Sequence, residues 1–461
     1  MRTAIPALSL SFLLLGAASA VAQSWVQLTP TTNPTPRRTG AMCFDPLSGG
    51  LLMYGGLQSG PTLLLNETWL WNGGDWSQLA PTTTPPARWG HRMVFDSRRG
   101  RVVTFGGRSP TTGVTANDTW EWDGSNWQQV VPTASPAARA FYAMAFDERR
   151  GKVIIYGAMS GFPNGNQTWE YDGTTWTQVI TPTTPPGLES PAMVYDKGRA
   201  VTVMFGGYYA LSPGTMYDWT WEYDGVDWTR RFPATSPNAR YRANCVYDEA
   251  RGRVVLHGGF NAGALTDTWD YDGNDWLQVA TSGPTKSTEG YLGHDPIGGY
   301  TLYFGGSAST GVSNETWLFT APTTAIAAPF GQGCATSAGV PSLLPTTTPV
   351  LGTSYSLGLS NGALTAIGLM VHGTDNTQFG PGFYLPLDMT FLGFGGCRLE
   401  TRPDLLLTEL LAAGSVTHTL PIPPTPSLAG AALFTQALLF DAAAPNGNGG
   451  MSNAVHAVLG Q

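Results

Sequence analysis

Hydrophobic positions along the chain fall in short runs that are separated by turn-forming residues. In one stretch, an apolar run at His91–Phe95 is followed by a turn and a second, β-branched run at Arg101–Phe105. Thr119–Trp122 comes next, and Asp123–Asn126 has the composition of a four-residue hairpin turn before Trp127. Because β-branched and aromatic residues favour strands, this stretch predicts four short antiparallel strands.

The same unit recurs along the chain, with intervals of 51, 49, 52, 48 and 48 residues between its first tryptophans. These tryptophans are Trp69, Trp120, Trp169, Trp221, Trp269 and Trp317. A Gly pair precedes the tryptophan in five copies, and the third copy has Gly157-Ala158. Each first run ends in an aspartate: Asp45, Asp96, Asp147, Asp196, Asp248 and Asp295. A repeated supersecondary unit of this length is typical of a solenoid or a propeller.

The repeat period, the Gly pair and the later Trp or Tyr pair resemble the kelch repeat over roughly residues 24–320. The resemblance implies an all-β fold, a six-bladed kelch β-propeller in residues 23–324. The sixth copy stops at Thr316–Phe319 without an outer strand, whereas Ser24–Leu28 matches an outer strand that has no blade. Because kelch propellers commonly pair an N-terminal strand into the last blade, we expect this segment to close the ring.

Residues 1–22 are typical of a signal peptide, with Arg2, an apolar stretch and an Ala20-Val21-Ala22 cleavage site. The sequence therefore predicts a secreted protein at the cell surface, in the periplasm or outside the cell, with no transmembrane segment. The formal net charge of −8 argues against a nucleic-acid partner, since such proteins usually carry a basic face.

Residues 325–461 lie beyond the repeat and alternate apolar stretches with Gly and Pro turns. The predicted strands are Ser354–Leu359, Ala366–Val371, Val416–Pro421, Ala431–Phe440 and Val455–Leu459. This pattern predicts a small C-terminal β-sandwich. Export permits disulfides, and Cys334 and Cys397 are the candidate pair. Cys43 and Cys245 lie inside predicted strands, where small buried side chains are expected.

An arginine stands eight residues before the repeated aspartate in four copies, at Arg37, Arg88, Arg139 and Arg240. The fourth copy has Leu188 at this position and the sixth has Ser287. In kelch domains the segment leading into the inner strand lies on the ligand-binding face, where arginines could bind acidic partners. The alternative is a structural hydrogen bond that each blade repeats.

Aromatic residues that do not follow the repeat are further ligand-binding candidates on this face. Trp89, Phe141 and Tyr241 lie in the lead-in segments, and Tyr208 and Tyr209 follow a Gly pair. Variable loops on a rigid scaffold often carry function, and aromatic faces suit sugars or peptides. The alternative is that these rings pack within their own loops.

No catalytic, metal-binding or cofactor-binding motif is present in the sequence, so we expect neither a cofactor nor a metal. The interpretation favoured here is a secreted binding or scaffold protein that recognises a protein or polysaccharide through the propeller mouth. One alternative is an exported hydrolase or lyase acting on carbohydrate, with Glu189, Glu289, Arg242 and His91 at the mouth. Another alternative is a structural surface or matrix component. The sequence does not indicate an oligomeric state.

Overall fold

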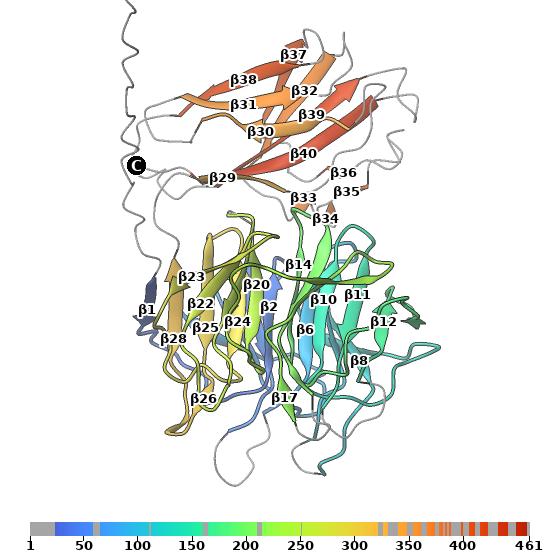
Figure 1. The fold of residues 1–461 in the computed structure, drawn as a ribbon, viewed down its shortest axis with the longest axis vertical. Helices are drawn as coiled ribbons and strands as arrows, with labels where there is room; N and C mark the ends of the chain where they lie inside the picture. Colours follow the sequence, from blue (N-terminus) through green and yellow to red (C-terminus); the bar gives the residue numbers. More distant parts are fainter. Residues whose placement is uncertain are drawn as a thin grey trace, which may run out of the picture.

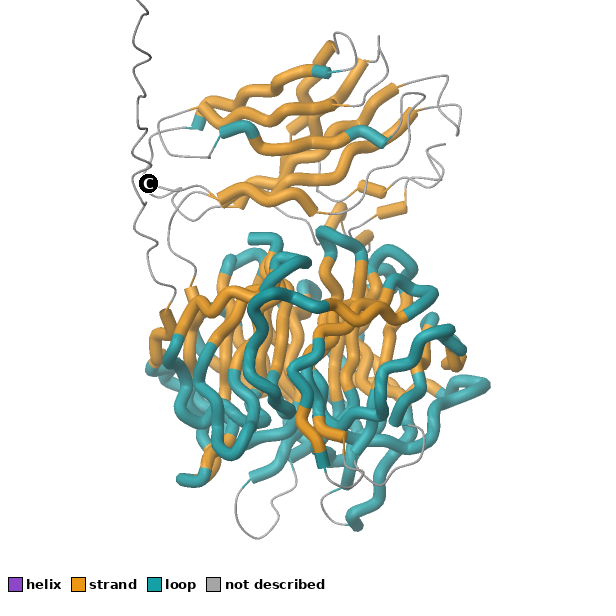
Figure 2. Tube along the Cα trace, viewed as in Figure 1, coloured by secondary structure: helices purple, strands orange, loops and turns teal. Residues whose placement is uncertain are grey.

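A computed structural model describes residues 24–58, 65–109, 112–159, 165–209, 214–249 and 251–320. Beyond these, it describes the C-terminal strands together with residues 340–341, 346–347, 415 and 422. The described part of the chain consists of strands and connecting turns, with no α-helix (Figures 1 and 2). The expected signal peptide and the expected Cys334–Cys397 pair lie outside the described residues.

Between residues 24 and 320, the described strands form six four-stranded antiparallel sheets. The first three sheets are β2 (Ala41–Asp45), β3 (Gly50–Tyr54), β4 (Thr68–Trp71) and β5 (Trp76–Leu79); β6 (Arg92–Asp96), β7 (Arg101–Phe105), β8 (Thr119–Trp122) and β9 (Trp127–Val130); and β10 (Ala143–Asp147), β11 (Lys152–Tyr156), β12 (Thr168–Tyr171) and β13 (Trp176–Val179). The next two are β14 (Ala192–Asp196), β15 (Val201–Phe205), β18 (Thr220–Tyr223) and β19 (Trp228–Arg231); and β20 (Asn244–Asp248), β21 (Arg253–His257), β22 (Thr268–Tyr271) and β23 (Trp276–Ala280).

The last of these sheets joins the two ends of the repeat region. Its inner strands are β24 (Tyr291–Asp295), β25 (Tyr300–Phe304) and β28 (Thr316–Thr320), and its outer strand is β1 (Ser24–Leu28). The antiparallel register of β1 runs from Ser24 opposite Thr320 to Leu28 opposite Thr316, as the sequence predicts. The innermost strands contact one another in a closed cycle, so the arrangement fits a β-propeller.

Local sequence explains the turns of each blade. The carboxylate of Asp96 accepts hydrogen bonds from the backbone N–H groups of Arg98 and Arg99, both at 3.1 Å, and this caps the turn after the inner strand. In the outer hairpin, Asp123 accepts in the same way from Ser125 and Asn126, and Gly124 takes a φ of 96°. The inner strand lies one residue later than predicted here, at Arg92–Asp96 instead of His91–Phe95.

One hydrogen bond between neighbouring blades repeats around the whole ring. The indole N–H of each outer-strand tryptophan donates to the hydroxyl of the threonine that opens the third strand of the preceding blade. The six bonds, 2.8–3.0 Å long, are Trp25 to Thr268, Trp76 to Thr316, Trp127 to Thr68, Trp176 to Thr119, Trp228 to Thr168 and Trp276 to Thr220. Trp25, on the N-terminal strand, therefore completes a cycle that the last repeat lacks.

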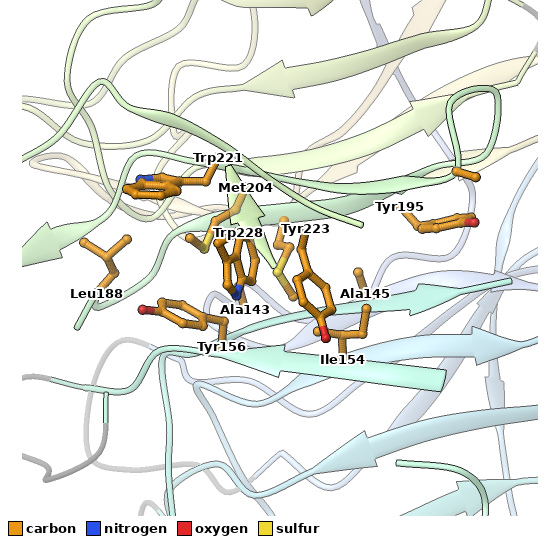
Figure 3. Close-up of a cluster of buried hydrophobic side chains, with 12 residues drawn as sticks. Ala143, Ala145, Ile154, Tyr156, Leu188, Tyr195, Met204, Trp221, Tyr223 and Trp228 are labelled. Atoms are coloured by element: carbon orange, nitrogen blue, oxygen red, sulfur yellow. The ribbon is translucent and has the colours of Figure 1, made fainter. Parts of the chain in front are cut away.

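Aromatic packing surrounds these hydrogen bonds. Between the third and fourth sheets, Trp228 stacks on Tyr223 with ring centroids 5.0 Å apart and lies 5.2 Å from Tyr156 (Figure 3). Ile154 and Met204 fill the same cluster, and both are buried. The blades are therefore held together by large apolar surfaces with one satisfied polar group at the centre of each.

Beyond residue 320, the structure describes four further sheets. A five-stranded sheet contains β29 (Ile326–Phe330), β40 (Gly449–Val458), β39 (Ala432–Phe440), β32 (Ile367–Gly373) and β37 (Leu405–Leu410). A three-stranded sheet contains β30 (Ser342–Pro345), β31 (Ser354–Ser360) and β38 (Val416–Pro421). Two small pairs are β33 (Gln378–Gly380) with β34 (Phe383–Tyr384), and β35 (Leu387–Asp388) with β36 (Arg398–Leu399).

The two larger C-terminal sheets share one apolar cluster, which includes Leu357 on β31 and Met370 on β32. The imidazoles of His372 on β32 and His418 on β38 also meet, with 3.0 Å between their Nε2 atoms. Figure 1 places the C-terminal strands on one side of the ring, whereas β17 (Thr215–Met216) and β26 (Ser307–Ala308) lie on the opposite side.

We expect Trp25→Ala to lower the free energy of unfolding by about 3–5 kcal/mol, because it removes a buried indole and the hydrogen bond to Thr268. Chemical denaturation of the protein would measure this. Val26→Ala is the matched control, since Val26 lies on the same strand with 49% of its surface exposed. Equal effects of the two changes would contradict the role given to Trp25.

Candidate functional site

The segments that lead into the inner strands meet in a ring of backbone hydrogen bonds around the axis. Each blade contributes one residue whose N–H donates to the carbonyl of the corresponding residue in the preceding blade, at 2.6–3.3 Å. The six residues are Thr39, Gly90, Phe141, Ser190, Arg242 and Glu289, with φ between 49° and 70°. Since only one of them is glycine, five side chains are held in the left-handed region, where each costs of order 1 kcal/mol.

This backbone ring fixes the side chains that surround the mouth. The residue before each ring position pairs with a residue just after the Gly pair; Trp89 pairs with Arg108, Glu189 with Tyr208 and Tyr241 with Phe260. The mouth thus combines the lead-in segments with the loops that follow the Gly pairs. Figure 1 places β17 and β26, which lie in such loops, on the side of the ring away from the C-terminal strands.

The aromatic candidates form two contacting groups that Arg242 joins. Trp89 meets Phe141 edge to face, with centroids 5.2 Å apart, and Tyr241 contacts both Tyr208 at 5.4 Å and Phe260 at 5.9 Å. The guanidinium carbon of Arg242 lies 5.9 Å from the centroid of Phe141 and 4.7 Å from that of Tyr241. These distances are typical of cation–π contacts.

Two carboxylates lie beside the same arginine. Arg242 is 3.0 Å from an oxygen of Glu289 and 3.8 Å from one of Glu189. Arg38 binds the other oxygen of Glu289 at 2.5 Å. The mouth patch is therefore defined as Arg38, Trp89, Arg108, Phe141, Glu189, Tyr208, Tyr241, Arg242, Phe260 and Glu289.

Half-buried rings give this patch apolar surface that solvent still reaches. Trp89, Tyr208, Tyr241 and Phe260 are half-buried, whereas Phe141 is only 4% exposed and packs beneath its neighbours. Burial raises the pKa of Tyr241, so its hydroxyl is a neutral donor at physiological pH. Tyr209 lies next to Tyr208 on β16 (Tyr208–Tyr209), opposite Thr215, and is also half-buried.

The four repeated arginines do not face the mouth, which corrects their assignment as ligand-binding residues. Arg37, Arg88, Arg139 and Arg240 are at most 2% exposed. Arg88 forms two hydrogen bonds of 2.7 Å with the carboxylate of Asp118 and one of 2.8 Å with the carbonyl of Gly106. Arg240 binds Asp267 and the carbonyl of Gly258 in the same way. These guanidinium groups attach the lead-in segment to the Gly pair of their own blade.

The acidic partner of the arginine stands two residues before the repeated tryptophan. The residue at this position differs between the copies, and the contact that the arginine makes differs with it. Arg37 binds Glu67 at 2.6 Å. Arg139 has Gln167 at the equivalent position, and its guanidinium donates to two carbonyls, those of Ala137 at 3.2 Å and Gly157 at 3.5 Å. Burial without a carboxylate lowers the pKa of Arg139 to about 10. In the fourth copy an apolar pair, Leu188 and Trp219, replaces the ion pair.

His91 is not a mouth residue either. Its side chain is fully buried and lies 5.6 Å from Tyr54, measured between ring centroids. Burial, together with the nearby charges of Arg88 and Arg92, lowers its pKa to about 3, so the imidazole stays neutral at physiological pH. Glu189, Glu289 and Arg242 are brought together as the carbohydrate-active alternative requires, but His91 is not.

Arg38 and Arg108 are mouth residues that sequence reasoning missed. Arg38 precedes a ring position, and the guanidinium carbon of Arg108 lies 5.8 Å from the centroid of Trp89. Each stands next to a repeated feature, Arg37 in one case and Gly106-Gly107 in the other. A comparison of the six copies at the positions beside the repeated residues could have found them.

Within the described residues, no group of three or more His, Cys, Asp or Glu side chains could hold a metal ion. None of the described elements is a helix that is both long and apolar enough to cross a membrane.

No protein-family model and no curated protein matches the chain. Among solved structures, 137 chains match. One of them, described as "Structure of YjhT", is 15% identical and covers 65% of this chain and 96% of its own, with a TM-score of 0.47.

Arg88→Leu should lower the free energy of unfolding at neutral pH by about 3–5 kcal/mol, because Asp118 would remain partly buried without its partner. Burial alone would raise the pKa of Asp118, but the hydrogen bonds and charge of Arg88 outweigh it and lower that pKa. In the wild type, the ion pair of Arg88 with Asp118 contributes to stability above the unfolded pKa of an aspartate, about 3.9. This contribution is lost as the pH falls through the folded pKa of Asp118. The difference between variant and wild type should therefore shrink in acid.

Urea denaturation at several pH values measures this difference. Arg101→Leu is the control, since Arg101 donates to the carbonyl of Gly100 in a turn of the same blade. A loss of stability in Arg88→Leu that does not change with pH would contradict the assignment.

Proposed function

We propose that the chain is a secreted, six-bladed kelch-type propeller followed by a C-terminal β-sandwich, and that it binds a polysaccharide or protein partner through the mouth patch. The kelch assignment rests on the repeat pattern, and the sheets that share Leu357 and Met370 support the sandwich. The signal-peptide pattern of residues 1–22 supports secretion.

One observation carries the binding proposal. Half-buried aromatic rings and paired charges from several blades form a patch on a rigid backbone ring, on the side away from the C-terminal strands. Five non-glycine residues of this ring are held at positive φ, which costs free energy, and such strain often accompanies binding sites. Aromatic faces next to arginine and carboxylate groups suit hydroxyl-rich or peptide ligands.

A carbohydrate-active enzyme is the second candidate. Glu189 and Glu289 lie on either side of Arg242, and glycosidases commonly use two carboxylates. Both carboxylates are bound to arginine, and this favours a positioning role for them over proton transfer. Turnover of a polysaccharide that also binds the mouth patch would favour the enzyme.

Binding of the exported chain to an array of acidic and neutral polysaccharides and of extracellular proteins would test the proposal. Trp89→Ala and Tyr241→Ala should each weaken binding at least about tenfold, as expected for aromatic residues at the centre of an interface. Arg108→Gln, a smaller change of side chain at the same patch, should weaken binding less.

Phe232→Ala is the matched control, since Phe232 is 78% exposed and follows the outer strand β19. Binding that survives both mouth variants would overturn the proposal, and so would binding that Phe232→Ala removes to the same extent.

A further inference from the structure

An arginine projects into the axis of the ring just beneath the mouth. Arg92 is the first residue of the inner strand β6. The equivalent residue is alanine in three blades, at Ala41, Ala143 and Ala192, and is Asn244 and Tyr291 in the other two. Arg92 and these residues line a cavity of about 70 Å³. The second blade thus places a long cation where three other blades place a methyl group.

The other cations around the channel have acidic partners. Arg38 and Arg242 both bind Glu289 on the mouth side. Beyond the cavity, at the opposite end of the channel, Lys197 binds both Glu148 and Glu249. Each of these cations therefore has at least one carboxylate beside it.

Arg92 differs because, among the described residues, no carboxylate lies within 4.0 Å of its guanidinium. Its Nη1 donates to the carbonyl of His91 at 3.2 Å. Burial lowers the pKa of Arg92, and the more distant Tyr142, Glu289 and Cys245 offset this only in part. A guanidinium nonetheless keeps its proton in a protein, so the charge stays in the channel. Arg92 is half-buried, and a partly desolvated charge without a counter-charge is costly.

The walls of the cavity supply further donors. Each inner strand pairs with only one strand of its own sheet, so its other edge faces the channel with unpaired backbone groups. A volume of about 70 Å³ is several times the 10–15 Å³ that one water molecule needs, so a small oxyanion fits there.

We propose that this cavity is an oxyanion site in which a carboxylate binds the guanidinium of Arg92. The fork of a guanidinium matches two carboxylate oxygens, which would supply the missing counter-charge. The carboxylate could come from a small free acid or from the acidic group of a larger ligand seated at the mouth. The inference does not depend on the proposed function, since a small free acid could bind without any ligand on the mouth patch.

Titration calorimetry of the exported chain with acetate and with methyl glucuronide would test the site, with methyl glucoside as the neutral control. Arg92→Gln should weaken binding of the carboxylates by about tenfold or more, and Arg92→Lys should weaken it less. Arg101→Gln, which removes a guanidinium on a turn of the same blade, should leave binding unchanged. Tighter binding of methyl glucuronide than of acetate would identify a larger acidic ligand as the source.

Thermal unfolding gives a second readout, because bound acetate should raise the Tm of the wild type more than that of Arg92→Gln. If Arg92→Gln does not fold, the comparison of Arg92→Lys with the wild type decides. Carboxylate binding that is equal in the wild type and the Arg92 variants would overturn the inference, as would the absence of carboxylate binding to the wild type.

Discussion

The hydrogen bond from each outer tryptophan to a threonine of the preceding blade is the contact on which the ring depends. It places the largest side chain of one blade against the preceding blade and satisfies its indole N–H there. Because the sixth repeat has no outer strand, the cycle closes only through Trp25, almost 300 residues away along the chain. The N-terminal strand is therefore part of the last blade in energetic as well as in topological terms.

The blades share this contact but differ where the repeat meets the mouth. The ion pair of Arg88 with Asp118 becomes the apolar pair of Leu188 with Trp219 two blades later. Buried ion pairs and well-packed apolar pairs are often close in stability, so such an exchange costs least when both partners change together. Arg139 shows the intermediate case, in which the arginine remains and the acid is missing. The position of the repeated arginine is therefore structural. The mouth patch, in contrast, differs from blade to blade and distinguishes its face of the ring from the other face.

Much of the fold could be predicted from the sequence because each strand is encoded locally. The Asp turn and the first tryptophan mark every blade, five copies carry a Gly pair, and the unpaired segment Ser24–Leu28 indicated how the ring closes. The backbone ring at the mouth could not be predicted, since Thr39, Phe141 and Glu289 share a φ value but no chemistry. The ion pair of Arg88 depends on an acid 30 residues later, which local reasoning did not connect to it.

Hydrogen exchange of the protein, followed by mass spectrometry, tests the central claim most directly. If the ring is closed by β1 and by the backbone bonds at the mouth, the amides of β28 should exchange as slowly as those of the third strands of the other blades. The amides of the six mouth positions should be protected to a similar degree. Exchange of β28 at the rate of an exposed edge strand, together with rapid exchange at the mouth positions, would contradict the account.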